Sequence, residues 1–232
     1  MNGKFLLALL ATIVALPVVT LLVLLSRPGA SVLNSANTAF ETDQPPPTSR
    51  VGGRLGAGGC VDCDLSHADL SQQDMNRADL RATNFSHANL SQALLINAIL
   101  SQVTLTQTNL SEANLRGADL IEANIDAASF DDAQLLQVSL TDSRINNASF
   151  KQVDLRDADL SATVIRNSDF SGSSLYGAVM REATLTNVNF AGADLRYVDF
   201  SNAALENVNF DGAQLDFAIL PDGTGYHGVA PY

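Results

Sequence analysis

The stretch ADLIEANIDAASFDDAQL, residues 118–135, repeats one pattern of side chains every five residues. Each unit contains a small residue, a polar residue, a large apolar residue and two further, mostly polar residues. An α-helix repeats every ~3.6 residues and a β-strand every ~2, so neither element explains this period. The frame runs without insertion from Leu65 to Leu220, and every fifth residue in it is Leu, Ile, Phe or Met. Two residues before each of these central residues stands Ala, Val, Ser or Thr, except at Cys63 and Gln73.

A frame this strict predicts a solenoid, in which each repeat contacts only its neighbours. Five of the central phenylalanines are spaced by twenty residues, namely Phe130, Phe150, Phe170, Phe190 and Phe210. A coil with four five-residue sides stacks them in one column, whereas a coil with three or five sides scatters them. We therefore predict an all-β fold of about eight four-sided coils, with a spacing of ~4.8 Å between coils. The central residue and the residue two before it face inward.

The units ADLSQ, ANLSQ, ANLRG, ADLIE and ADLRY resemble the A-(D/N)-L-x-x motif of pentapeptide-repeat proteins. The resemblance covers residues 61–220 and implies a right-handed quadrilateral β-helix over residues 60–224. In this family a turn such as LPDGT, residues 220–224, closes the last coil, which leaves residues 225–232 as a C-terminal tail.

Glycine occupies one position in the frame. The five glycines between residues 60 and 220 all lie two residues after a central residue, at Gly117, Gly172, Gly177, Gly192 and Gly212. We interpret this position as a corner of the coil that requires small side chains.

The N-terminal part of the chain differs from the repeats. Residues 5–25 contain no charge and are long enough for an apolar helix that spans a bilayer. We expect residues 1–27 to be a transmembrane anchor or a cleaved signal segment, and residues 28–59 to be a Pro/Gly-rich linker. Lys4 and the α-amino group favour a cytoplasmic N-terminus, which would put the repeat domain in a periplasm or thylakoid lumen. If the N-terminal segment is cleaved, the protein is secreted or lumenal.

The charge of the chain excludes one class of function. The formal net charge is −12, and residues 60–232 hold 23 acidic residues but only nine basic ones. Direct nucleic-acid binding requires a basic surface, so we do not expect it. The acidic walls of the coil, those around Leu70/Phe130 and Leu80/Leu160, suit a cationic protein partner or the mimicry of nucleic acid.

The repeats contain no pattern that indicates catalysis. A repeated Asp is a feature of the motif, whereas general acid–base chemistry requires one carboxylate that differs from its neighbours. Nucleophile elbows, phosphate loops and metal-binding motifs are also missing from the sequence. We expect no enzymatic activity, no cofactor and no metal. His67 and His87, twenty residues apart, should stack on the outside of adjacent coils.

Cys60 and Cys63 have three interpretations. Cys63 occupies a small inward position, and Cys60 lies on the five-residue frame one step before the first repeat. Both therefore fit as buried fillers that cap the first coil at its N-terminal end. In an exported domain they would form a disulfide, and the remaining alternative is a redox pair.

One wall of the coil carries the candidate protein interface. Most outward positions are Ser, Thr, Asn, Asp or Gln, but the wall around Leu175, Leu195 and Leu215 differs. Its outward residues include two columns with a twenty-residue spacing. One column contains Arg156, Tyr176 and Arg196, and the other contains Tyr197 and Phe217. Clustered Tyr, Phe and Arg are typical of protein interfaces. The alternatives are self-association, cover by the tail 225–232, and plain exposure.

These features favour a membrane-tethered interaction, scaffold or assembly module. The C-x-x-C-D-L start and the N-terminal layout resemble pentapeptide-repeat proteins of cyanobacteria and chloroplast lumens, which implies a photosynthetic membrane and a partner in a membrane complex. The second alternative is a DNA-mimicking acidic rod that binds a gyrase-like enzyme, as the resemblance to quinolone-resistance members implies. A sugar-active enzyme on a β-helix is the third, although no loop interrupts the frame.

Overall fold

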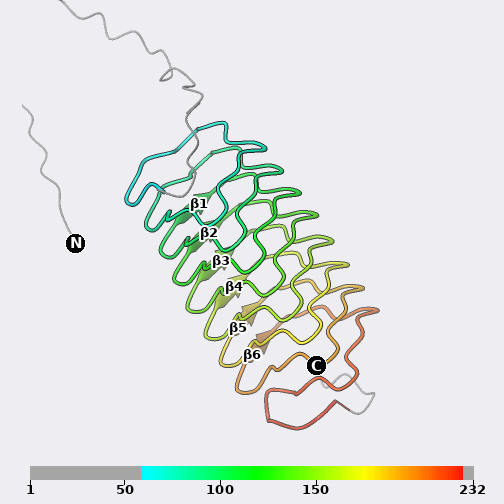
Figure 1. Ribbon diagram of the computed structural model, residues 1–232. Helices are drawn as coiled ribbons and strands as arrows, with labels where there is room; N and C mark the ends of the chain where they lie inside the picture. Colours follow the sequence, from blue (N-terminus) through cyan, green and yellow to red (C-terminus); the bar gives the residue numbers. More distant parts are fainter. Residues whose placement is uncertain (1–58, 227–232) are drawn as a thin grey trace, which may run out of the picture. The chain divides into compact units, whose positions relative to one another are not determined.

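The computed structural model describes residues 59–226, which form a parallel β-solenoid. Six short strands, twenty residues apart, pair side by side in the order β1-β2-β3-β4-β5-β6 (Figure 1). They are β1 (Thr104–Thr106), β2 (Asn124–Asp126), β3 (Arg144–Asn146), β4 (Val164–Arg166), β5 (Thr184–Thr186) and β6 (Ala204–Glu206). The expected N-terminal anchor helix, nearly all of the linker and the end of the tail lie outside the described residues.

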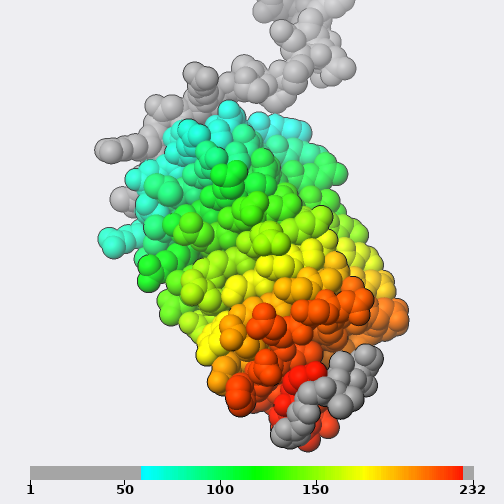
Figure 2. Space-filling view, turned by 90° about the vertical axis from the view of Figure 1, so that its right-hand side faces the viewer, coloured from blue at the N-terminus to red at the C-terminus, as the bar shows by residue number. Residues whose placement is uncertain are grey.

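The coil is four-sided. Parallel pairing joins each residue to the one twenty positions later, as in Leu105↔Ile125 of β1 and β2. Single bridges with the same offset mark the other three sides and the first coils of the strand side, and they continue from Asp64↔Asn84 to Asp199↔Ile219. One turn of the solenoid therefore contains four five-residue sides. In Figure 2 the turns follow one another as bands of colour from cyan to red.

The corners are turns that need a positive φ. On three sides the residue three after the central one donates its N–H to the central carbonyl, as Ala78 does to Met75 (3.1 Å). Arg77, the residue just before Ala78, has φ 60°, and a positive φ is required at the third position of a type II turn. Within residues 59–226, this hydrogen bond is absent after β1–β6, where the backbone extends into a strand instead.

The expectation that the corners require small side chains is wrong. The side chain at the corner points outward, and residues as large as Tyr197 and Phe217 occupy this position with φ 61° and 63°. Glycine is favoured there because it adopts positive φ without strain. A Cβ added to Gly192 would have no atom within 4 Å, so φ and not space is the constraint there.

The core confirms the inward-facing columns. From Leu70 to Phe200 the central residues are all buried, and so are nearly all the small residues two positions earlier. The predicted phenylalanine column is present: the rings of Phe130, Phe150 and Phe170 stack with centroids 4.6 Å apart. Phe190 and Phe210 continue the column at 5.3 and 5.8 Å.

Hydroxyl groups in the small inward positions bond the backbone. Thr108, Ser143 and Thr163 are buried, and each donates to a central carbonyl of the preceding coil at 2.8 to 3.1 Å. Among the described residues no buried side-chain nitrogen or oxygen lacks a partner. The polar residues in the small inward positions therefore leave no unsatisfied hydrogen-bonding group in the core.

The C-terminal end of the rod is partly covered. The N–H of Gly223 donates to Leu220, and the N–H of Leu220 donates to Thr224, which closes a turn over residues 220–224. Tyr226 then donates its N–H to Ala218 and packs against the core. No helix within residues 59–226 has the length and apolarity required to cross a bilayer.

Candidate functional site

The stacking of coils places Arg156, Tyr176 and Arg196 in one outward column. Each lies one residue after a central leucine, and its carbonyl accepts a hydrogen bond from the coil before it. The donors to these three carbonyls are the N–H groups of Gln137, Asp157 and Gly177, at 2.9 to 3.0 Å. We call the side of the coil around the central residues 75, 95, 115, 135, 155, 175, 195 and 215 the Tyr176 wall.

Two arginine–aspartate pairs on this wall have the same geometry. Nε and Nη2 of Arg156 donate to Asp154 at 2.8 and 2.7 Å, and Arg196 donates to Asp194 at the same distances. These bonds hold the pKa of each carboxyl below its ordinary value. They also raise the pKa of each guanidinium, so both pairs stay ionised at neutral pH. Each pair is a flat, charge-compensated unit fixed on the wall.

An open hollow of about 540 Å³ lies between the two pairs. It is lined by Asp154, Arg156, Ser174, Tyr176, Asp194 and Arg196. The guanidinium carbon of Arg196 lies 5.4 Å from the ring centroid of Tyr176, within the range of a cation–π contact. The stacking of Tyr176 and Arg196 expected from their twenty-residue spacing is therefore present.

Three aromatic side chains continue from this hollow towards the C-terminal end. The rings of Tyr197 and Phe217 stack with centroids 4.9 Å apart, as their spacing predicted. Tyr176 contacts Tyr197 at 5.1 Å, which joins the two columns into one cluster. The exposed fractions are 38% for Tyr176, 48% for Tyr197 and 67% for Phe217. The structure thus brings all five predicted interface residues together on one exposed surface.

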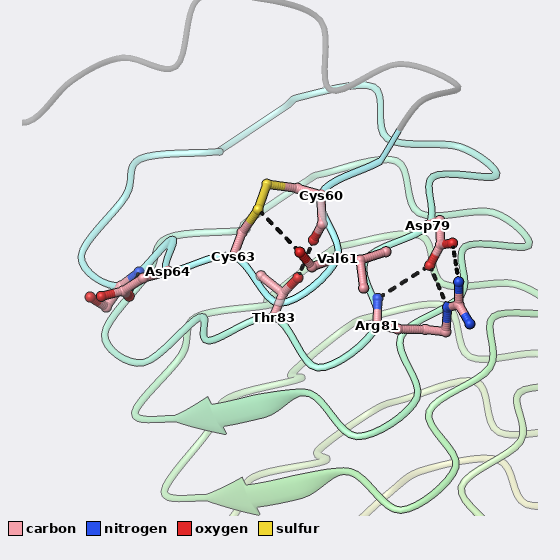
Figure 3. The surroundings of a disulfide bond; sticks show 8 residues. Cys60, Val61, Cys63, Asp64, Asp79, Arg81 and Thr83 are labelled. Atoms are coloured by element: carbon pink, nitrogen blue, oxygen red, sulfur yellow. Dashed lines mark hydrogen bonds and ion pairs between the residues drawn. A yellow bond between two sulfur atoms is a disulfide. The ribbon is translucent and has the colours of Figure 1, made fainter.

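Cys60 and Cys63 form a disulfide at the N-terminal end of the solenoid, with 5.6 Å between their Cα atoms (Figure 3). Both are half-buried and pack against the core. The buried Thr83 donates to the carbonyl of Cys60, as other inward hydroxyls do to central residues of the preceding coil. Cys60 therefore occupies the position of a central residue, and the disulfide closes the start of the first coil.

The described residues contain no group of three metal-binding side chains. His67 and His87 stack with ring centroids 4.7 Å apart and parallel planes, as their spacing predicted. In residues 59–226 these two imidazoles have no third ligand in reach that would complete a metal site.

The aspartates that pair with the two arginines were not predicted from the sequence. The sequence pattern indicated Arg156 and Arg196 as interface residues but not Asp154, Asp194 or Ser174. The signal is the tripeptide D-L-R at residues 79–81, 154–156 and 194–196. All three copies form the same two-bond pair, because residues on either side of a central residue point to the same outer face.

Comparison with protein families identifies the class of this chain. Residues 63–102, 98–135 and 121–157 match the model of eight pentapeptide repeats, and residues 143–219 match the pentapeptide repeat region. Together these matches cover more than half of the sequence. The chain belongs to the pentapeptide-repeat family, which agrees with the four-sided coil and the buried central residues.

Solved structures similar to this chain include three that differ in source. HetL, a pentapeptide repeat protein involved in heterocyst differentiation regulation in the cyanobacterium Nostoc, is 26% identical, with 76% of this chain and 94% of HetL covered and a TM-score of 0.43. Rfr23 from the cyanobacterium Cyanothece is 27% identical over 50% of this chain and 92% of its own, with a TM-score of 0.48. QnrB1, a plasmid-mediated fluoroquinolone resistance protein, is 18% identical over 69% and 92%, with a TM-score of 0.45. No individually curated protein matches the sequence.

Proposed function

We propose that this protein is a non-enzymatic interaction module, a scaffold or assembly element that binds a protein partner through the Tyr176 wall. The observation that carries the proposal is the exposed cluster of Tyr176, Tyr197 and Phe217 beside Arg156 and Arg196. Aromatic residues and arginine are enriched at protein interfaces relative to the rest of the surface, and tyrosine and arginine are frequent among the residues that supply most of the binding energy.

Charge favours this wall over its neighbours. The two adjacent walls are strongly acidic, with six acids and one base around Leu70/Phe130 and eight acids and two bases around Leu80/Leu160. On the Tyr176 wall Arg156 and Arg196 are each compensated by an aspartate. A partner that docks there therefore avoids the desolvation of unpaired charges.

We further propose that residues 5–25 tether the rod to a membrane, with the repeats on the extracytoplasmic side, in a periplasm or thylakoid lumen. The uncharged length of this segment and the disulfide Cys60–Cys63 support the placement, since disulfides persist in oxidising compartments. We also propose that the rod has about eight coils and a length of about 38 Å, which is supported by the bridges with the twenty-residue offset between Asp64 and Ile219.

Photocrosslinking in intact cells tests the docking wall. A photoreactive residue in place of Phe217 should give a discrete covalent adduct with the partner, and the same residue in place of Thr184 of β5, on the opposite wall, should not. Tyr197→Ala combined with the probe at position 217 should weaken the adduct. Equal adducts from both positions would show that the Tyr176 wall is not the interface.

Membrane fractionation with protease protection tests the location. We expect the full chain in the membrane fraction, with the repeats digested only after the outer compartment is opened. A soluble repeat domain in the cytoplasm would favour the second candidate, a DNA-mimicking rod that binds a gyrase-like enzyme through its two acidic walls. That candidate predicts that the purified chain inhibits DNA supercoiling by gyrase and loses this effect at high salt.

A further inference from the structure

The outward column that contains Tyr176 alternates in character along the rod. Six successive coils contribute Ile96, Arg116, Leu136, Arg156, Tyr176 and Arg196. A large apolar or aromatic side chain is therefore followed, on the next coil, by an arginine. Backbone hydrogen bonds between consecutive coils hold the six residues in line. We call this set the Tyr176 column.

Backbone donors alternate in the same way from Arg116 to Arg196, whereas the N–H of Ile96 donates to Oδ1 of Asn76 at 2.7 Å. The N–H groups of Arg116, Arg156 and Arg196 each donate to the Asn or Asp two residues earlier, at 3.2 to 3.3 Å. These acceptor side chains lie on the outer face of the wall. The N–H groups of Leu136 and Tyr176 have no hydrogen-bond partner in the described part of the chain, since Gln134 and Ser174 do not take them. Two unpaired donors therefore stand two coils apart.

The repeat distance selects the conformation of a bound chain. At ~4.8 Å per coil, two coils span about 9.6 Å. A polyproline II helix repeats every three residues, or about 9.3 Å. An extended strand presents one face every ~6.7 Å, and two turns of an α-helix span about 10.8 Å. Over two repeats the mismatch is about 0.6 Å for polyproline II but more than 2 Å for the α-helix.

Hydrogen-bond chemistry points to the same ligand. The carbonyls of the Tyr176 column already accept bonds from the preceding coil, so the wall cannot add a β-strand. The free backbone groups of the column are therefore donors, namely the N–H groups of Leu136 and Tyr176, and the remaining arginine N–H groups lie beside them. A proline-rich chain carries carbonyl acceptors and few N–H donors, and its backbone has no internal hydrogen bonds.

The size of the wall argues against a twin rod as the occupant. One side of the coil is about 10 Å wide, and six coils are about 29 Å long, which gives about 300 Å². A stable protein interface buries about 800 Å² on each partner. A single extended segment needs less area, and the rods' strongly acidic neighbouring walls would repel each other.

We propose that the Tyr176 column binds a proline-rich segment of a partner protein in the polyproline II conformation, parallel to the rod axis. The segment's carbonyls accept hydrogen bonds from the N–H groups of Tyr176 and Leu136, and its rings pack on the Tyr176 side chain in the hollow between Arg156 and Arg196. This inference rests on the proposed function of the wall and names the partner's chemistry.

The test uses the full-length chain in detergent and a fluorescent, capped decaproline peptide, with binding followed by anisotropy. We expect saturable binding, weakened at least tenfold by Tyr176→Ala. Ser174→Asn supplies the acceptor that Asn114 provides for Arg116, so it should capture the free N–H and weaken binding about threefold to tenfold without unfolding the rod. Ser139→Asn, the same change on an adjacent wall, should leave binding unchanged.

Several results would overturn the inference. The first is that the chain does not bind decaproline. The second is that it binds a capped glycine–serine decapeptide as tightly as decaproline. The third is that it prefers a helical peptide of Ala, Glu and Lys to decaproline. If changing Pro45, Pro46 and Pro47 to Ser strengthens decaproline binding, the chain's own linker and not a partner is the occupant. If decaproline fails but the Phe217 crosslink persists, the wall remains an interface and only the ligand class is wrong.

Discussion

Arg196 holds two groups at once: it donates two hydrogen bonds to Asp194 on its own coil, and its guanidinium lies 5.4 Å from the ring of Tyr176 on the coil before. The carboxylate compensates the charge of the guanidinium and fixes its position beside the ring. The tyrosine is thereby fixed between two arginine–aspartate pairs, and the surface offered to a partner is rigid before binding. Rigid surfaces lose less entropy on association.

The phenylalanine column should dominate the stability of the rod. Phe170 is fully buried between Phe150 and Phe190, so Phe170→Ala should lower the free energy of unfolding by about 3–5 kcal/mol. Phe217→Ala removes an exposed ring and should change it by less than about 0.5 kcal/mol. Chemical denaturation of both variants measures the difference. A similar small loss for both would contradict a packed Phe column.

The arginine–aspartate pairs should resist acid. The pKa of Asp194 is lowered by the hydrogen bonds from Arg196, so its contribution to stability is fully present above the ordinary Asp pKa of 3.8. It is lost only as the pH falls through the lower, folded-state value. The stability gap between the parent and Asp194→Asn should therefore persist at pH 4 and narrow below it. A gap that closes between pH 7 and pH 5 would show that the pair is not formed.

The disulfide should protect one end of the rod only. A bridge across this short loop contributes about 2 kcal/mol in the chain-entropy model. Reduction, or Cys63→Ser, should increase hydrogen exchange at the N–H groups of Cys60 and Asp62, which bond to Asp79 and Arg81. Amides near Tyr176 should exchange as before. Faster exchange along the whole rod would show that the first coil controls global unfolding.

The corner at Gly192 separates backbone strain from steric clash. Gly192 has φ 67° and open space where a Cβ would stand. Gly192→Val should cost about 1–2 kcal/mol, since L-residues with branched side chains are strained at positive φ. Gly192→Asn should cost only a few tenths, because asparagine tolerates this region. Equal costs in denaturation experiments would contradict an origin in φ.

The sequence predicted the core better than the corners. Periodicity identifies the inward columns, because an apolar residue at every fifth position marks the positions that are buried. The twenty-residue spacing of the phenylalanines from Phe130 to Phe210 gives the number of sides. At the corners, Gly192 suggested a need for small residues, but Tyr197 occupies the equivalent position. The constraint at the corners is a positive φ, and the size of the side chain does not indicate this dihedral angle. The arrangement around Tyr176 also needed coordinates, because Asp154 resembles every other Asp of the motif until its arginine is seen beside it.

The four-sided coil has a consequence for changes in chain length. Each coil contacts only the coils before and after it, so the frame tolerates the removal of whole units. Deleting five residues between Cys63 and Arg156 would leave the core columns intact but turn everything after the deletion by about a quarter turn, because one side of the coil is lost. Deleting twenty residues would keep the Tyr176 wall on the same side and move it about 4.8 Å closer to the N-terminal end. Length changes in this rod therefore act as rotations or translations of its binding surface.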